Sequence, residues 1–272
     1  MSSLAPAAAG RTGSRATLSD PVRVQLLRWG TVGALVVCWE LVCRGPLAHS
    51  GYVVGPVAVL RDGIPKVVAS EPLSSLGHTT WRFLVAFALT AVLGTVVGLS
   101  LGRLHRQLFL GSRDVVAVLY ALPMVPFYPL FVLWLGLGDR SEIAFGVIHG
   151  VIPVILMTMA ASAEVSPTLL ESSRAMGAGR VQRLLVVTLP AVVPELMSAL
   201  KVGAALTLLG ILLAELMISV GGVGSFVAGQ ISNQQAAALD AMVLLVCVGA
   251  LIVNALLSAA EKRVSAWRPP AS

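Results

Sequence analysis

Residues 80–102 read TWRFLVAFALTAVLGTVVGLSLG, a stretch with a single charged side chain. A helix needs about 20 mostly apolar residues to cross the hydrocarbon core of a bilayer, so this stretch predicts a membrane-spanning helix. Small residues recur in it at every fourth position, at Ala86, Thr90, Gly94, Gly98 and Gly102. Such a stripe lets two helices approach closely in lipid, where the hydrophobic effect supplies little attraction between them. We therefore expect Gly94, Gly98 and Gly102 to form a helix-packing face.

The composition of the whole chain agrees with this interpretation. Hydrophobic residues make up 57% of the 272 residues and charged residues 12%, whereas soluble domains are about one-quarter charged. This balance excludes a soluble globule, a disordered chain and a coiled coil, and it predicts an integral membrane protein. The three cysteines lie in apolar stretches without a CxxC pair, and the four histidines are scattered without an HExxH motif. We therefore expect neither a redox site nor a metal site.

Six stretches are apolar and long enough to span a membrane, which predicts an all-α membrane protein with six transmembrane helices. They lie near residues 26–43, 80–102, 115–137, 141–163, 196–219 and 238–260. The third stretch contains Pro123, Pro126 and Pro129. Because proline removes a helical hydrogen-bond donor, we expect a kink or a break there.

The distribution of basic residues predicts the orientation. If the N-terminus is cytoplasmic, fourteen of the 19 Lys and Arg residues lie on the cytoplasmic side and five on the other. This asymmetry favours two cytoplasmic termini. Residues 1–25 are expected to form a disordered cytoplasmic tail, residues 26–264 the transmembrane domain and residues 265–272 a second tail. An uncleaved first span is favoured over a cleaved signal peptide, since the apolar run is long and Glu40 lies near its end.

Two connections differ in what they predict. Residues 44–79 fit an interfacial helix interrupted at Pro65 or an ordinary outer loop equally well. Residues 164–195, on the cytoplasmic side, predict a short helix that starts at Ser166 and Pro167 and stops at Gly177. A second helix is expected from Arg180 until near Pro190. Such a helix, glycine turn and helix could dock into a groove on a cytoplasmic partner.

The residues of this loop resemble the EAA loop of binding-protein-dependent ABC transporter permeases. That family's pattern is E-A-A, three residues, G, nine residues, I, one residue and L-P, and all spacings agree here. The matching positions are Glu171, Ser172, Ser173, Gly177, Val187, Leu189 and Pro190. The chain departs from the pattern only by two serines in place of the alanines and by valine in place of isoleucine.

Two further stretches resemble the nitrate, sulfonate and taurine branch of that family. One is LPMVPFYPLFVLWLGLGDRSEI, residues 122–143, and the other is AELMISVGGVG, residues 214–224. The resemblance implies the fold of a type I ABC importer permease. It also implies import of a small solute, for which a sulfonate, nitrate or taurine-like anion is the first candidate. Relatives in the branch carry other small molecules, including thiamine precursors.

The resemblance also implies partners. A permease pair, here a homodimer, would form the pathway in the bacterial cytoplasmic membrane. A separate ATPase pair would bind ATP and magnesium, and a periplasmic or lipid-anchored binding protein would deliver the solute. The chain contains no G-x-x-x-x-G-K-[ST] motif, so we expect no nucleotide site, no cofactor and no enzyme activity of its own. No nucleic acid is expected among its partners.

A few polar and aromatic residues inside the spans are candidates for the pathway or a gate. A charge inside a span costs about 2.5 to 3.5 kcal/mol on insertion scales, so Glu215 needs a partner or a function. It could bond to backbone or line the pathway, and Tyr128 and Trp134 could offer aromatic surface to a solute or simply pack. A secondary transporter remains the rival from another class, although mid-span charge is sparse and no internal repeat is evident.

Overall fold

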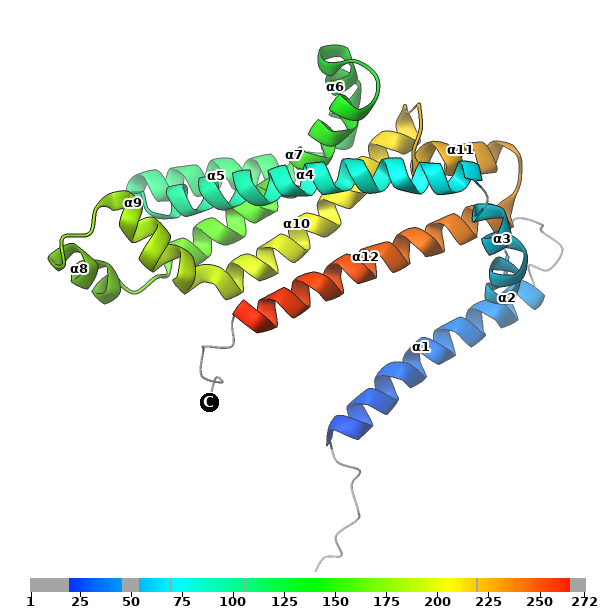
Figure 1. Ribbon diagram of the computed structural model, residues 1–272, viewed down its shortest axis with the longest axis horizontal. Helices are drawn as coiled ribbons and strands as arrows, with labels where there is room; N and C mark the ends of the chain where they lie inside the picture. The colour runs from blue at the N-terminus through cyan, green and yellow to red at the C-terminus, as the bar shows by residue number, and fades with distance from the viewer. Residues whose placement is uncertain (1–19, 46–53, 69, 105, 219, 265–272) are drawn as a thin grey trace, which may run out of the picture. The chain divides into compact units, whose positions relative to one another are not determined.

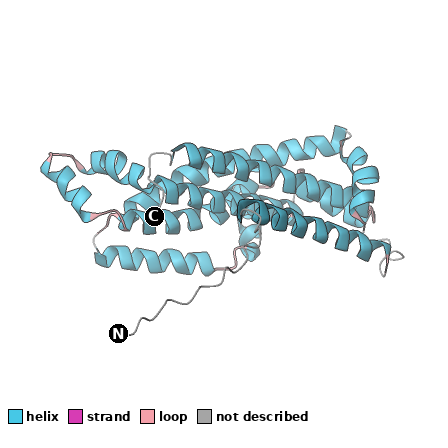
Figure 2. Ribbon diagram, turned by 90° about the horizontal axis from the view of Figure 1, so that it is seen from below, coloured by secondary structure: helices cyan, strands magenta, loops and turns pink. Residues whose placement is uncertain are grey.

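The computed structural model describes residues 20–45, 54–68, 70–104, 106–218 and 220–264, which form helices and connecting loops with no strand (Figure 2). Five of these helices are long and apolar enough to cross a membrane, and a bent pair can supply a sixth span. The predicted all-α membrane architecture is therefore confirmed. The chain divides into two units, residues 1–57 and 58–272.

The first unit contains helix α1, Asp20–Arg44. It begins before the expected span, so residues 20–25, which the composition placed in a tail, are helical, while residues 1–19 lie outside the described residues. Pro21 fits the first turn because the nitrogen there needs no intrahelical acceptor. Near the other end, Glu40 pairs with Arg44 at 2.5 Å and accepts a hydrogen bond from the backbone N–H of Val57 at 3.2 Å. Both interactions satisfy a carboxylate at the end of an apolar helix.

The second unit begins with a run of short helical segments. They are the π-helical η1, Val59–Gly63, and α3, Ile64–Val67, and the short α2, Pro56–Ala58, contains the boundary between the units. The connection that could have been a helix or a loop is therefore partly helical, and Pro65 lies in the first turn of α3, where it breaks nothing. Segments η1 and α3 pack against α12, Ala236–Val264.

Three long helices form the centre of the second unit (Figure 1). Helix α7, Asp139–Ala163, packs against both α4, Ser70–Gly102, and α10, Leu189–Met217. Helix α4 starts ten residues before the expected span, and its 33 residues cover about 50 Å at the helical rise. Helix α12 lies beside α10, where Lys201 and Glu261 form an ion pair at 2.5 Å.

The small-residue stripe of α4 faces α7. A Cβ atom added to Gly94 would lie 2.5 Å from Val154 Cγ1, and one added to Gly98 would lie 2.8 Å from Thr158 Cβ. At Gly102, an added Cβ would collide with the carbonyl oxygen of Met159. The backbones of α4 and α7 thus approach too closely for a larger residue at these three positions.

The proline-rich third span is broken, as expected. Helix α5, Arg106–Ala121, is followed by a short 3-10 segment η2, Val125–Phe127, and by α6, Tyr128–Leu135. The two parts are bent by 80°. Pro126 and Pro129 lie in the first turns of η2 and α6, so a new helix starts at each proline instead of running through it.

Two helical segments differ from what the sequence predicted. The loop helices α8, Pro167–Ala175, and α9, Arg180–Gln182, were expected, but the chain does not leave the helix near Pro190. It continues through a π-helical segment η3, Arg183–Thr188, directly into α10, and the π turn changes the hydrogen-bond register just before Pro190, which lies in the first turn of α10. Helix α11, Val223–Ser232, occupies a connection where no helix was predicted. Residues 265–272 lie outside the described residues.

Candidate functional site

The predicted site residues gather at two ends of the second unit. Helices α8 and α9 lie at one end of the bundle formed by α4, α7 and α10, and α6 and α11 lie toward the other (Figure 1). We name the first the loop end, defined by residues 164–195. We name the second the network end, defined by the interactions of Arg82 and Glu215.

At the loop end, α8 has well-formed boundaries. Ser166 occupies the N-cap position without a side-chain hydrogen bond to the helix, and Pro167 lies in the first turn. Gly177 has a φ of +81°, the left-handed conformation that glycine adopts without steric cost. The N–H of Ala178 bonds to the carbonyl of Ser173 at 3.0 Å, which is the hydrogen-bond pattern of a Schellman helix terminus. The sequence therefore identified the residues that start and stop this helix.

One face of α8 is fixed to the bundle. Leu170 packs in a buried cluster with Leu99 of α4 and Val192 of α10, and Val187 and Leu189 pack against the same cluster. Ser173 is buried and donates to the carbonyl of Leu170 at 2.8 Å. These contacts connect the loop to two transmembrane helices, so a displacement of α8 would be transmitted to α4 and α10.

The opposite face of α8 is exposed. Glu171 and Ser172 lie on the surface, and Met176, at the tip beside Gly177, is 80% exposed. Leu169 on α8 and Val181 on α9 are further exposed apolar side chains of the loop. Apolar side chains gathered at the end of a charged loop are typical of a surface that a partner covers. Pro190 lies beyond this tip, in the first turn of α10.

At the network end, Glu215 is buried inside α10 and fully partnered. Its carboxylate accepts a bond from Arg82 Nη1 at 2.9 Å and from the backbone N–H of Gly224 at 2.9 Å. The hydroxyl of Thr79 lies 2.8 Å from both carboxylate oxygens and donates to them, while it accepts from the N–H of Val223 at 2.8 Å. The partners come from α4 and from the chain after α10, so the carboxylate joins three segments.

Arg82 is the centre of this network and was not among the predicted site residues. It is 4% exposed and also pairs with Asp139 at 2.7 Å and with the buried Glu142 at 2.5 Å. A further bond runs from Nη1 to the carbonyl of Gly221 at 3.0 Å. The sequence contained a signal for this network, namely one arginine and two glutamates in three apolar spans. Buried charges are usually paired, so these residues could have been expected to meet.

The loop after α10 closes tightly over Glu215. Gly222 has a φ of +93°, and a Cβ atom added to it would overlap the Glu215 carboxylate. A Cβ atom added to Gly224 would lie 2.6 Å from the backbone nitrogen of Leu216. Glycine at both positions lets the backbone donate to the carboxylate at close range.

The two aromatic candidates have different environments. Tyr128 is buried, stacks at a tilt on Phe145 with ring centres 5.0 Å apart, and donates to the carbonyl of Ile218 at 3.3 Å. It therefore packs α6 on α7 and α10. Trp134 is 71% exposed on α6, and its ring centre lies 6.3 Å from that of Phe131. The structure brings Tyr128 near Glu215 and leaves Trp134 at the surface.

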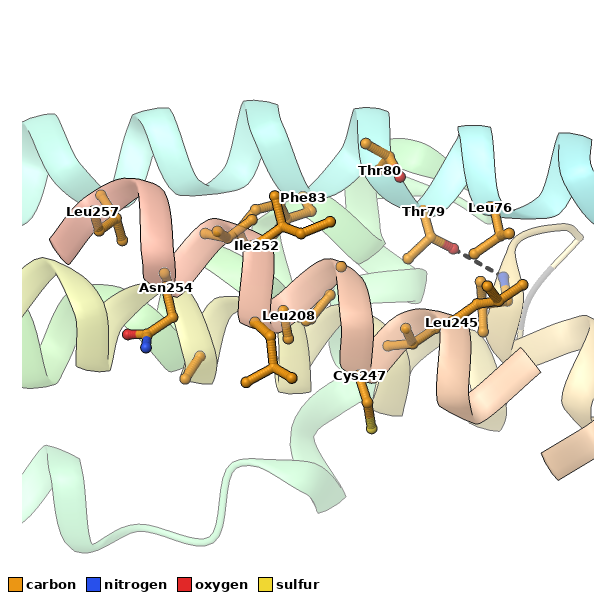
Figure 3. Close-up of a pocket in the computed structure, with 18 of the residues that line it drawn as sticks. Leu76, Thr79, Thr80, Phe83, Leu208, Leu245, Cys247, Ile252, Asn254 and Leu257 are labelled. Atoms are coloured by element: carbon orange, nitrogen blue, oxygen red, sulfur yellow. Dashed lines mark hydrogen bonds between the residues drawn. The ribbon is translucent and has the colours of Figure 1, made fainter. Parts of the chain in front are cut away.

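A cavity of about 700 Å³ lies between α4, α10 and α12 (Figure 3). Its labelled walls are mostly apolar, with Leu76, Phe83, Leu208 and Ile252 among them. Thr79, at one end, accepts the bond from Val223 that is dashed in Figure 3. Of its two charged or amide residues, Lys201 and Asn254, the first is paired with Glu261. This surface suits a lipid chain or another helix better than a small polar solute.

Within the ranges that the structure describes, no group of three His, Cys, Asp or Glu side chains is placed to hold a metal ion. Chemically, the network end can hold segments together, and the loop end can bind a partner.

Residues 94–266 match the family described as binding-protein-dependent transport system inner membrane component. This match covers more than half of the chain and includes the loop end and Glu215 of the network end, so the chain belongs to that family. It is therefore a multi-pass membrane protein and the permease subunit of a type I ABC importer, a transport protein and not an enzyme in the usual sense.

Relatives and solved structures agree with this assignment. The chain is 24% identical to a taurine transport system permease protein of Escherichia coli over 88% of both chains, and 23% identical to a putative aliphatic sulfonates permease of Bacillus subtilis over 86% of this chain and 84% of that one. It is 24% identical to a nitrate import permease of Synechocystis over 72% of this chain and 73% of that one.

Two solved transporters share the fold. One is a bacterial ABC transporter for the polysaccharide alginate, with a TM-score of 0.66, 14% identity, and coverage of 90% of this chain and 94% of that one. The other is the MetNI methionine ABC transporter, with a TM-score of 0.57, 20% identity, and coverage of 68% of this chain and 93% of that one.

Proposed function

We propose that this permease subunit is driven through its loop end by a separate ATPase, and that it imports a small anion of the sulfonate, taurine or nitrate type. The observation that carries the coupling role is the geometry of α8. One face packs on α4 and α10 through Leu170, and the other ends in the exposed tip formed by Met176 and Gly177.

The coupling mechanism follows from this geometry. The tip of α8 sits in a cleft of the ATPase, and the buried face moves with the transmembrane helices. Nucleotide-driven closure of the ATPase pair displaces α8, and the cluster around Leu170 passes this displacement to α4 and α10. The spans then alternate between inward-open and outward-open arrangements. Gly177 forms the turn, Glu171 provides a charged anchor at the surface, and Pro190 starts α10.

The same proposal sets the orientation and the partners. Most Lys and Arg residues lie on the side that carries the loop end, which the positive-inside rule places in the cytoplasm together with both termini. Two copies of the chain form the pathway, the ATPase pair binds ATP and magnesium, and a binding protein presents the solute at the network end.

The relatives support the anionic solute. Permeases whose names specify taurine, aliphatic sulfonates and nitrate align over 72% or more of the chain. The second candidate is another small organic solute, which a riboflavin permease of Chloroflexus aurantiacus favours at 29% identity over 42% of the chain. An ion-coupled secondary transporter is disfavoured by the family assignment.

The test is uptake by vesicles that contain the permease, its ATPase and its binding protein. Radiolabelled taurine, an alkanesulfonate, nitrate and thiamine are compared with and without ATP. Wild type should take up one of the anions only with ATP. Glu171→Lys should lower ATP-driven uptake and copurification of the ATPase, because it reverses a charge on the exposed face of α8.

The matched control is Asp114→Lys, the same charge reversal at an exposed site on α5 outside the loop. It should retain uptake and copurification. If Glu171→Lys retains uptake and copurification as Asp114→Lys does, the exposed face of α8 is not the surface that binds the ATPase. If uptake proceeds without ATP or without the ATPase, the proposed driving mechanism is wrong. Selective uptake of thiamine would show that the solute is a small organic molecule and not one of the anions.

A further inference from the structure

A positively charged cleft lies at the loop end, between the end of α4 and the helices of the loop. It has a volume of about 410 Å³. Four arginines line it: Arg103, just after α4, Arg174 on α8, and Arg180 and Arg183 on the helical run that leads into α10. The cleft is concave and built from three separate segments, whereas the tip at Met176 protrudes. The cleft shares Val181 with the exposed surface of the loop, but neither Glu171 nor Met176 lines it.

The charge of this cleft is not compensated within the described part of the chain. There, none of the four arginines forms an ion pair with a carboxylate, although Arg44, Arg82 and Lys201 each do. Burial and the nearby charges of Arg174 and Arg183 lower the pKa of Arg103 from its usual value. The guanidinium of Arg103 donates to the carbonyl of Ser162 at 2.9 Å. Like charges held together in a cleft with only a neutral acceptor are suited to an anion.

The position of the cleft suggests the chemistry of that anion. It begins where the apolar helix α4 ends at Gly102, which is the depth of lipid headgroups if α4 spans the bilayer. Exposed apolar side chains flank it at Leu104, Val181 and Leu185. Guanidinium groups bind phosphate oxygens through paired N–H donors, and basic pockets beside the ends of transmembrane helices bind anionic headgroups.

We propose that this cleft binds a phosphate group, supplied by an anionic phospholipid headgroup or by soluble phosphate. The bound group bridges Arg103, which follows α4, to Arg174 and Arg183, which belong to the loop. It relieves the repulsion between these arginines and holds the loop against the transmembrane helices. The inference needs no ATPase and therefore stands or falls separately from the proposed coupling role.

The test uses the full-length permease in nanodiscs and has two arms. In one, phosphatidylglycerol is added to a phosphatidylcholine bilayer, and in the other, inorganic phosphate is titrated onto phosphatidylcholine nanodiscs. The midpoint of thermal unfolding is measured in both, because a ligand that binds only the folded form raises it. The apparent affinity should fall about tenfold in Arg103→Gln and in Arg174→Gln, the usual consequence of losing one charged hydrogen-bond partner.

Arg113→Gln is the matched control, since Arg113 is an exposed arginine of α5 outside the cleft. It should respond as wild type does. Arg174 is exposed on α8, so its variant should fold even if Arg103→Gln does not. A rise in the unfolding midpoint in either arm that is smaller in the cleft variants supports the site. A rise with phosphatidylglycerol alone identifies the lipid headgroup as the source of the phosphate group. No response in either arm, or an equal response of all variants, overturns the proposal.

Discussion

The two ends of the bundle differ in how their charged side chains are paired. At the network end, Arg82 is buried and contacts three carboxylates, and Glu215 also binds a hydroxyl and a backbone N–H. At the loop end, four arginines share a cleft without a carboxylate partner among the described residues, and the apolar side chain of Met176 is exposed.

This difference indicates which end has its charged groups paired within the subunit. The network end holds α4, α7, α10 and the following loop together by internal bonds, which makes it a rigid connection within one subunit. The loop end leaves interactions for other molecules, as expected for a surface that an ATPase docks on and a phosphate group fills. Substitutions at the network end should therefore cost folding stability, and those at the loop end should cost transport.

The largest effect is expected from Arg82→Gln. It leaves the buried carboxylates of Glu142 and Glu215 without their cation, and breaking a buried ion pair in this way typically costs about 3 to 5 kcal/mol. The free energy of unfolding in detergent micelles is the measurement. Arg140→Gln removes an exposed arginine next to Asp139 and serves as the control. Equal stability of both variants would mean that the network does not hold the segments together.

A smaller loss is expected from Gly98→Leu in the stripe that joins α4 to α7. The new side chain must separate two backbones, and overpacking a tight contact costs about 1 to 3 kcal/mol. Gly111→Leu, at a position on α5 with open space around it, should be tolerated. Unfolding of the two variants in micelles checks this, and an unaltered Gly98→Leu would contradict the packing assignment.

At the loop end, Gly177→Ala should reduce ATP-driven uptake while it lowers stability by only about 1 to 2 kcal/mol. The cost arises because alanine is strained at a φ of +81°. Gly179→Ala, two residues away at a φ of −68°, keeps an allowed backbone and should transport as wild type does. Both variants are compared by uptake in vesicles and by unfolding. Full transport by Gly177→Ala would show that the turn is not needed for coupling.

The smallest effect is expected from Lys201→Met on the flank of the bundle. Its ion pair with Glu261 is partly exposed, with side-chain exposures of 24% and 26%, so its loss should cost about 0.2 to 1 kcal/mol. Thermal unfolding of this variant beside Arg82→Gln compares a partly exposed ion pair with a buried one. A loss as large as that of Arg82→Gln would remove the distinction between the two environments.

The sequence predicted the features that depend on local chemistry. Apolar runs gave the spans, three prolines gave the break between α5 and α6, and Ser166, Pro167 and Gly177 gave the bounds of α8. Local patterns could not predict that the helix passes through Pro190, because the π turn that permits it depends on packing against α4 and α8.

The network was harder to predict because its members are far apart in the sequence. Arg82 lies 133 residues from Glu215, and only the fold brings them to 2.9 Å. Glu215 was correctly singled out as needing a partner, but Arg82, Asp139 and Glu142 were not recognised as that partner set. Three charged residues in different apolar spans are a signal for pairing, although the pairing itself requires the helix arrangement.

Photo-crosslinking from the two ends shows at which end the ATPase binds. A photoreactive amino acid is placed at Met176 or at Trp134, which are 80% and 71% exposed, in vesicles that contain the permease, its ATPase and its binding protein. The ATPase should be captured from Met176 and not from Trp134. Capture of the ATPase from Trp134 and not from Met176 would contradict the assignment of the loop end as the side from which the transporter is driven.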